Sequence, residues 1–179
     1  MAERAIAYIA LGSNLDEPLE QVCRGIRSLA RLRQTELERC SSLYRTEPVG
    51  DTAQPDFINA VCRVVTALTP EQLMGELLAL ERRHGRVRTG ARGGPRRLDL
   101  DLLLYGCETR ATAELELPHP RLHERAFVLY PLAELDPRLE IPGRGGVAQL
   151  AAACRGKRIE RLQSAPVCGP DRLATVQTR

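Results

Sequence analysis

The segment RRLDLDLLLYG (residues 96–106) decides the fold and gives the first indication of chemistry. Side chains two residues apart lie on the same face of a strand, so Asp99 and Asp101 share one face and the intervening leucines share the other. Two adjacent carboxylates repel each other and hold their protons more tightly unless a cation lies between them. Magnesium suits this position because it takes carboxylate oxygens and shares its shell with waters and substrate phosphates. The segment therefore predicts a strand with one apolar face and one polar face, on which the two aspartates either bind a metal or are ordinary polar side chains exposed to solvent.

Hydrophobic periodicity places this strand last in a series of six elements. Apolar runs bounded by turn formers predict strands, and apolar positions that recur every three or four residues predict helices. The expected elements are a strand at 5–11, a helix opening at Asp16 and Pro18, strands at 35–45 and 57–66, a helix from Thr69 to Gly85, and the strand of the aspartates. The second helix has the clearer ends, because Thr69, Pro70 and Gln72 give a capping box with proline in the first turn.

The order strand, helix, strand, strand, helix, strand predicts an α+β protein with a ferredoxin-like βαββαβ core. With right-handed crossovers, both helices cover one face of an antiparallel sheet, and the two aspartates point to the open face. Beyond Tyr105 we expect extra strands or loops, a short helix at 131–135 and another at 147–162, which could wall the open face into a cleft. We expect one domain over residues 1–162 and a loose tail over residues 163–179.

The composition is that of an ordinary globular protein. Of 179 residues, 43% are hydrophobic and 27% charged, and the formal charge of +3 does not by itself indicate nucleic acid. The six cysteines show no Cys-x-x-Cys spacing, so we expect reduced thiols rather than disulfides or a zinc site. No apolar stretch reaches the length of a membrane span, and the first residues lack the pattern of a signal peptide. These features predict a cytoplasmic protein with no membrane partner.

A segment rich in glycine and arginine, residues 85–97, comes directly before the aspartates. Its five arginines are Arg86, Arg88, Arg92, Arg96 and Arg97. Guanidinium groups make forked, charge-assisted hydrogen bonds to phosphate, and beside paired carboxylates they form the combination that phosphoryl transfer needs. A solvated basic loop and an RNA contact are the alternatives, because glycine and arginine occur together in both.

The scarce aromatic residues indicate a second group of candidate site residues. Phe57 and Phe127 are the only phenylalanines, and both lie beside polar or turn segments. Burial in the core is the usual role of such rings, and stacking on a ligand is the other. Asn59 would share a strand face with Phe57, and an amide beside a ring suits a flat heterocycle. His119 lies between two prolines, where a capping or core role and a phosphate contact are both open.

Seven blocks of sequence, taken in order, resemble one family. They are YIALGSN (8–14), SSLYRTEPVG (41–50), QPDFINA (54–60), GRVR (85–88), GPRRLDLDLLLYG (94–106), LPHPR (117–121) and RAFVLYPLAEL (125–135). Over roughly residues 5–160 the chain is similar to the 6-hydroxymethyl-7,8-dihydropterin pyrophosphokinases of folate biosynthesis. The resemblance implies that ATP donates its terminal pyrophosphate to the hydroxymethyl group of the dihydropterin. The pterin hydroxyl would attack the β-phosphorus and release AMP.

The resemblance also implies roles for individual side chains. Asp99 and Asp101 would bind two magnesium ions that bridge the triphosphate. The arginines that neutralise phosphate charge would be Arg86, Arg88 and Arg96. Contacts to ATP would come from Glu81, Arg88, Arg96, Leu102, His119 and Arg125. The pterin would lie between Phe57 and Phe127, with Asn59 as amide partner and with Thr46, Pro48 and Val49 reading its edge.

Two other classes of function stay open beside this one. An RNA-binding module would use the open face of a ferredoxin-like sheet, although aspartates on that face would repel phosphate. A metal-dependent phosphohydrolase fits the aspartates and arginines but does not explain Phe57, Asn59 and Phe127. We expect ATP and the dihydropterin as partners, no nucleic acid, and a monomer.

Overall fold

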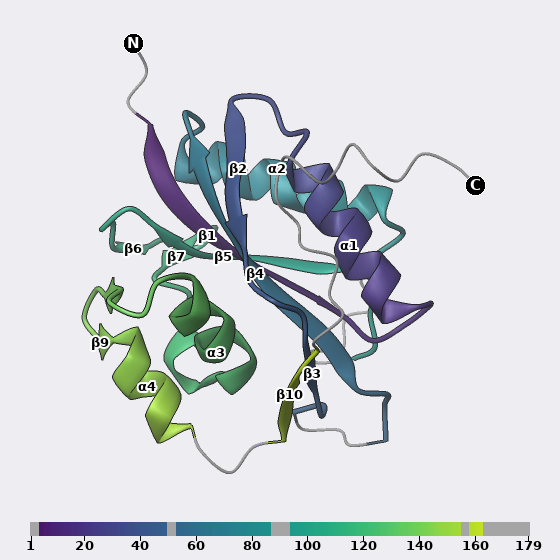
Figure 1. Cartoon of the computed structure of the whole chain (residues 1–179). Coiled ribbons are helices and arrows are strands. Elements are labelled where there is room, and N and C mark those ends of the chain that lie inside the picture. Colours follow the sequence, from purple (N-terminus) through teal and green to yellow (C-terminus); the bar gives the residue numbers. More distant parts are fainter. Residues whose placement is uncertain (1–3, 50–52, 87–93, 155–157, 163–179) are drawn as a thin grey trace.

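The centre of the molecule is a six-stranded antiparallel sheet, seen in a computed structural model that describes residues 4–49, 53–86, 94–154 and 158–162 (Figure 1). The strands are β1 (Ala5–Ser13), β2 (Thr35–Cys40), β3 (Tyr44–Thr46), β4 (Phe57–Thr66), β5 (Asp99–Tyr105) and β10 (Ile159–Arg161). Their order is β10-β3-β4-β1-β5, and β2 also pairs with β4. With helices α1 (Pro18–Leu29) and α2 (Pro70–Arg83) between the strands, this arrangement confirms the predicted ferredoxin-like core.

One face of the sheet is covered by α1 and α2, which lie together on one side of it in Figure 1. Side chains from both helices pack there on the leucines of β5 and the residue before it, namely Leu98, Leu100 and Leu102. Each of these leucines is at most 2% exposed, and full burial of such a side chain contributes about 1.5–3 kcal/mol. The leucines of the opening segment therefore fix which way the aspartates between them point.

The opposite face is partly covered by C-terminal additions, as expected. Helices α3 (Ala126–Leu135) and α4 (Val147–Ala153) pack on Tyr8, Val61, Leu103 and Leu104 and form a second apolar core. Figure 1 shows both helices on the side of the sheet away from α1 and α2. The smaller elements are β6 (Arg110–Ala111), β7 (Glu116–Leu117), a 3₁₀ turn (Leu122–Glu124), β8 (Glu140–Ile141) and β9 (Gly145–Gly146). These elements leave part of the sheet face uncovered, and the cleft described below lies there.

The capping residue of α1 differs from the prediction, whereas Pro18 in its first turn and both ends of α2 agree with it. Thr69 and Gln72 form the expected capping box on α2, and Gly85 follows the helix with a φ of +78°. The cap of α1 is Glu17 rather than Asp16, and no side chain accepts a hydrogen bond from the first turn. The carboxylate of Asp16 instead pairs with Arg97. The carboxylate that the local pattern assigned to the helix cap therefore forms a tertiary ion pair instead.

Three further elements have different bounds from those expected. The strand at 35–45 is broken into β2 and β3, because the Ser41 hydroxyl accepts a hydrogen bond from Val61 N at 2.9 Å in place of a strand partner. The helix at 131–135 begins already at Ala126 and contains Pro131 in its interior. The helix at 147–162 ends at Ala153, and β10 pairs with β3 instead. The tail from Gln163 lies outside the described residues.

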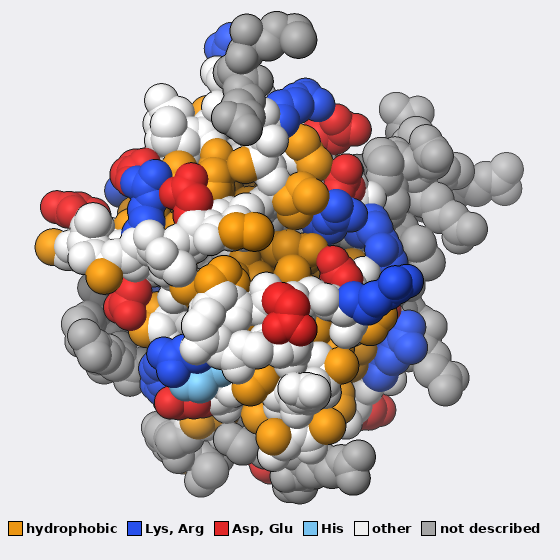
Figure 2. Space-filling view, turned by 90° about the vertical axis from the view of Figure 1, so that its left-hand side faces the viewer, with side chains coloured by type: hydrophobic (Ala, Val, Ile, Leu, Met, Phe, Trp, Pro, Cys, Tyr) orange, Lys and Arg blue, Asp and Glu red, His pale blue; other side chains and the backbone are white. Residues whose placement is uncertain are grey.

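The surface carries many ion pairs between exposed side chains, such as Arg4–Glu36 at 3.2 Å and Arg24–Glu20 at 3.1 Å. On the face shown in Figure 2, acidic and basic side chains are interspersed among uncharged atoms. Exposed pairs of this kind contribute only about 0–1 kcal/mol each, so burial of apolar side chains accounts for most of the stability. Within the part of the chain that the structure describes, no helix has the length and apolarity needed to cross a membrane.

Candidate active site

One cleft brings together most of the side chains that the sequence singled out. It lies on the uncovered part of the sheet, has a volume of about 790 Å³ and is lined by Thr46, Val49, Phe57, Asn59, Glu81, Arg86, Arg96, Asp99, Asp101, His119, Arg125 and Phe127, among others. Strand register explains this convergence. Gly12 of β1 pairs with Asn59 of β4 on one side and with Asp99 of β5 on the other, so two residues 40 apart in sequence are separated by a single strand.

Asp99 is held by two arginines from the segment that precedes it. Its Oδ2 atom accepts a hydrogen bond from Arg96 Nη1 at 2.5 Å, and its Oδ1 atom is bound by Arg86. Arg86 also binds Glu81 on α2, so one guanidinium bridges two carboxylates. Asp101 has a looser partner in Arg125, at 3.5 Å. Burial, followed by the charge of Asp99, raises the pKa of Asp101 to about 6.

Glu81 is a buried carboxylate beneath the aspartates, with a side chain only 3% exposed. Its Oε1 atom accepts a hydrogen bond from Leu100 N at 2.8 Å, which ties α2 to β5. Burial raises the pKa of Glu81 to about 7; the Leu100 amide opposes this rise, and the charge of Asp99 adds to it. Glu81 therefore supports the strand and orients Arg86 from below.

The donor chemistry of this cleft suits magnesium. Across the described residues, no group of three or more His, Cys, Asp or Glu side chains converges in the way a protein-only metal cage requires. Magnesium needs no such cage, since one or two carboxylates with waters and substrate phosphates are its usual shell. The raised pKa of Asp101 reflects in part a repulsion from Asp99 that a divalent cation would relieve. The two aspartates therefore fit the predicted metal.

Two aromatic rings lie on the walls of the cleft, each with an arginine above it. Phe57 begins β4 and Phe127 lies in the first turn of α3, and both rings are half-buried. The guanidinium of Arg96 is 5.9 Å from the centre of the Phe57 ring, and that of Arg125 is 5.6 Å from the centre of the Phe127 ring. The cleft thus has cationic groups and flat apolar faces side by side.

Asn59 lies deeper, on the same strand face as Phe57. The side chain is buried, and its Nδ2 atom donates to Thr46 Oγ1 at 2.8 Å. This contact fixes the amide so that its oxygen points away from Thr46. The predicted shared face of Phe57 and Asn59 is confirmed.

His119 makes a capping contact, one of the roles that the sequence left open, and its ring also reaches the cleft. Its Nδ1 atom accepts a hydrogen bond from Arg121 N at 3.2 Å, a local capping contact, and its Nε2 atom lies 4.0 Å from Asp101 Oδ2. Burial, followed by the charge of Arg125, lowers the pKa of His119 to about 4. The imidazole is therefore neutral at pH 7, with its proton on Nε2 toward the cleft.

Two of the described residues implied by the resemblance do not line the cleft. Leu102 is buried in the core beneath α1 and α2, so a contact to a nucleotide at this position would come from its backbone. Pro48 is also buried, between Glu47 and Val49, which do line the cleft. Arg88 lies outside the described residues.

Two residues of the first strand and its turn were missed as site residues. Asn14 is 2% exposed and joins two segments: its Nδ2 atom donates to Gln54 Oε1 at 3.0 Å and to Pro55 O at 3.2 Å, and its Oδ1 atom accepts from Arg96 N at 2.9 Å. A Cβ atom on Gly12 would come within 3.0 Å of Asn59 Oδ1, so only glycine leaves that amide in place. The signal available in the sequence was the block YIALGSN, where a glycine and an asparagine close a buried strand.

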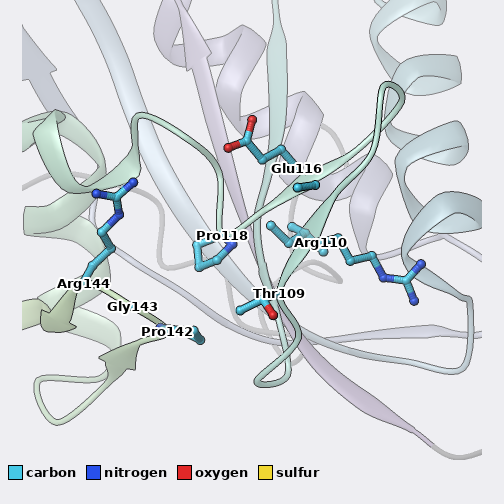
Figure 3. A pocket seen from close by; sticks show the side chains of 9 residues that line it. Thr109, Arg110, Glu116, Pro118, Pro142, Gly143 and Arg144 are labelled. Carbon is cyan, nitrogen blue, oxygen red and sulfur yellow. The ribbon is translucent and has the colours of Figure 1, made fainter.

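A second hollow, of about 410 Å³, lies between the β6–β7 and β8–β9 hairpins and contains none of the predicted residues. Figure 3 shows that the side chains of Arg110, Glu116 and Arg144 extend in different directions around it. Arg110 is already paired with Glu71 and Glu108. The hollow therefore does not offer a set of converging polar groups.

A ferredoxin-like fold whose open face joins paired carboxylates, arginines and two flat rings defines a nucleotide-dependent transferase. The family model for 7,8-dihydro-6-hydroxymethylpterin-pyrophosphokinase (HPPK) matches residues 8–137, and the chain belongs to this family. The family consists of ATP-dependent enzymes that transfer a pyrophosphoryl group to hydroxymethyldihydropterin in folate synthesis. The family and enzyme class predicted from the sequence are confirmed.

Individual relatives agree with this assignment. A 2-amino-4-hydroxy-6-hydroxymethyldihydropteridine pyrophosphokinase of Pseudomonas aeruginosa is 46% identical over 158 residues, which cover 88% of this chain and 97% of the relative. The enzyme of the same name from Bacillus subtilis is 40% identical over 135 residues, 75% of this chain and 80% of the relative. Among solved structures, a Plasmodium falciparum HPPK-DHPS with pteroate has a TM-score of 0.67 at 12% identity. It covers 84% of this chain, which spans 42% of that longer one, and it supports the fold alone.

Proposed function

We propose that the hydroxyl of the dihydropterin attacks the β-phosphorus of ATP directly within this cleft and releases AMP. The observation that supports this most is a juxtaposition on one sheet face. Asp99 and Asp101 lie in β5, and Asn59 and Phe57 lie two strands away in β4, with only the small residues Ala10 and Gly12 of β1 between them. One half of the cleft suits phosphate and the other suits a flat heterocycle, so the reacting groups would meet above β1.

The phosphate half would work through charge. Asp99 and Asp101 would hold two magnesium ions, which when bound withdraw charge from the triphosphate and lower the pKa of the attacking hydroxyl. Arg86 and Arg96, which bind Asp99 in this structure, would neutralise charge that develops on the transferred group. We assign the same role to Arg88 by resemblance. His119 would donate a hydrogen bond to phosphate from Nε2 because its Nδ1 atom is already an acceptor.

The pterin half would work through shape and a fixed amide. The heterocycle would stack between Phe57 and Phe127. Since Asn59 donates its Nδ2 hydrogen to Thr46, its side-chain oxygen points away from Thr46 and would accept from an N–H group on the pterin edge. Thr46, Pro48 and Val49 would read the same edge. A hydrolase that only cleaves ATP has no need of this half, and this observation favours a transferase.

The remaining expectations complete the proposal. The other nucleotide contacts would be made by Glu81, Arg125 and the backbone of Leu102. We propose that the protein acts as a monomer in the cytoplasm, since one chain supplies both halves of the cleft. Asp99 and Asp101 on the open face would repel the phosphates of RNA, so we propose no nucleic-acid partner.

Product analysis tests this function. The protein is incubated with ATP, magnesium and 6-hydroxymethyl-7,8-dihydropterin, and the products are identified by mass spectrometry. We expect equal amounts of AMP and pyrophosphorylated pterin from the wild type, and neither from a folded Asp101→Ala variant. Release of orthophosphate without a pterin ester would indicate the phosphohydrolase instead.

A further inference from the structure

Glu134 lies outside the cleft but connects two of its walls. It is on α3, seven residues after Phe127, and seven residues make two helical turns, so both side chains project from the same side of the helix. The carboxylate reaches the segment that leads into β3: Oε1 accepts from Ser42 N at 3.0 Å and from Ser42 Oγ at 2.8 Å, and Oε2 accepts from Tyr44 OH at 2.6 Å. Arg161 of β10 adds a contact at 3.1 Å.

The contact between Glu134 and Tyr44 is largely shielded from solvent, whereas Arg161 is exposed. Tyr44 is only 6% exposed. Burial opposes ionisation of Glu134, yet the hydrogen bonds from Tyr44 and Ser42 outweigh it and lower the pKa of the carboxylate. Burial and the neighbouring Glu134 raise the pKa of the Tyr44 phenol. The carboxylate and the phenol are thus held as an ionised acceptor and a neutral donor, which is a strong, charge-assisted arrangement.

The partners of Glu134 lead directly to the pterin wall. In β3, Tyr44 and Thr46 are buried and Arg45 between them is exposed, so the first two share the inner face. Thr46 accepts the hydrogen bond from Asn59. β3 has only three residues and pairs with β4 on one edge and β10 on the other. Without a further tie, so short a strand would fix Thr46 only loosely relative to α3.

We propose that Glu134 is a positioning residue for the pterin half of the site: it sets the distance between Phe127 on α3 and the wall formed by Thr46, Asn59 and Phe57. This inference rests on the proposed function, because it assumes that the pterin lies between these two walls. A slot for a flat ring works only at one width, since dispersion contacts on both faces weaken steeply when a gap opens. Within the described residues, the hydrogen bonds and ion pairs of Glu134 go to Ser42, Tyr44 and Arg161, and none goes to β5 or α2, which carry Asp99, Asp101 and Glu81.

The test uses three variants and one matched control. Glu134→Leu removes every acceptor, Glu134→Gln keeps the size but replaces one acceptor oxygen with NH₂, and Tyr44→Phe removes a single donor and leaves the fold. The control is Glu160→Gln, because Glu160 binds Arg45 at 3.1 Å on the exposed side of the same short strand. Dissociation constants are measured by fluorescence titration with 6-hydroxymethylpterin in the presence of a non-hydrolysable ATP analogue, and separately for the analogue alone.

The expected result is a loss confined to the pterin. The pterin dissociation constant should rise about tenfold in Glu134→Leu and about threefold in Tyr44→Phe, as for loss of charge-assisted hydrogen bonds. Glu134→Gln should fall between them, and the Glu160→Gln control should match the wild type. The constant for the ATP analogue should stay within twofold in all four. If Glu134→Leu does not fold, Glu134→Gln and Tyr44→Phe still give the answer.

Two outcomes would overturn the inference. Pterin binding within twofold of the wild type in Glu134→Gln and Tyr44→Phe would show that the tie does not set the slot. A parallel loss of nucleotide affinity would show a general structural role. If the wild type binds the ATP analogue but no pterin, the proposed function itself fails, and this result is distinct from the other two.

Discussion

Replacement of Asn14 by alanine should damage both stability and turnover, although Asn14 does not line the cleft. Its side chain makes three hydrogen bonds, to Gln54, Pro55 and the backbone N–H of Arg96. The asparagine thereby joins two segments. One leads into β4, which begins at Phe57, and the other leads into β5 and carries Arg96. Alanine would remove the partner of two partly buried backbone groups, the N–H of Arg96 and the carbonyl of Pro55.

The magnitude follows from those three contacts. At about 0.5–1.5 kcal/mol net for each hydrogen bond, Asn14→Ala should lower the free energy of unfolding by about 2–4 kcal/mol. For a chain of this size that corresponds to a fall in melting temperature of about 5–15 °C. Turnover should fall by about tenfold or more, because the backbone of Arg96 loses its side-chain anchor and the guanidinium is placed less well.

Urea unfolding and steady-state kinetics measure the two effects, and Asn14→Asp separates them. Aspartate still accepts from Arg96 N but cannot donate to Gln54 or Pro55. It should therefore lose stability as alanine does while keeping more of the turnover. The reasoning is refuted if Asn14→Ala unfolds within 0.5 kcal/mol of the wild type, or if the aspartate variant is the slower enzyme.

Three further predictions concern single residues. Arg96→Ala should reduce kcat by orders of magnitude with a modest change in ATP affinity, because its charge contact matters most in the transition state; a change in KM alone would contradict this. Gly12→Ala should cost about 1–3 kcal/mol in urea unfolding and weaken pterin binding, because its Cβ would lie 3.0 Å from Asn59 Oδ1; unchanged pterin affinity would count against the close approach. Burial and nearby arginines lower the pKa of His84, so the folded protein favours the neutral ring. The stabilisation by the neutral ring is therefore present above pH 6.5 and is lost as the pH falls. Between pH 8 and pH 5.5, the melting temperature of His84→Gln should fall less than that of the wild type.

Local patterns were sufficient for the core of the fold. Alternation in LDLDL placed the leucines beneath the helices and the aspartates in the cleft, and the capping box at Thr69 gave the start of α2. The patterns failed where a distant partner decided the outcome. Asp16 pairs with Arg97 and therefore does not cap the helix. The residues of β10 do not favour a strand by themselves, and β10 forms because it pairs with β3.

The site residues also divide into those that local patterns could predict and those that only distant contacts reveal. Paired carboxylates, clustered arginines and rare aromatic residues are visible in a sequence because each is unusual by itself. Gly12, Asn14 and Glu134 are not unusual residues, and their importance comes from contacts with Asn59, Arg96 and Tyr44 that strand register and helix packing create. No period of two or 3.6 residues reports such a contact, so the structure was needed to find them.

The path of one oxygen atom tests the central claim most directly. The substrate is ATP that carries ¹⁸O at the oxygen between the α- and β-phosphorus atoms. It is incubated with the protein, magnesium and the dihydropterin, and the masses of the products are measured by mass spectrometry. Attack of the pterin hydroxyl on the β-phosphorus breaks the bond from that phosphorus to the bridging oxygen, so all of the label should appear in AMP and none in the pterin product. Label in the pyrophosphorylated pterin, or in free pyrophosphate with no pterin ester formed, would contradict the account.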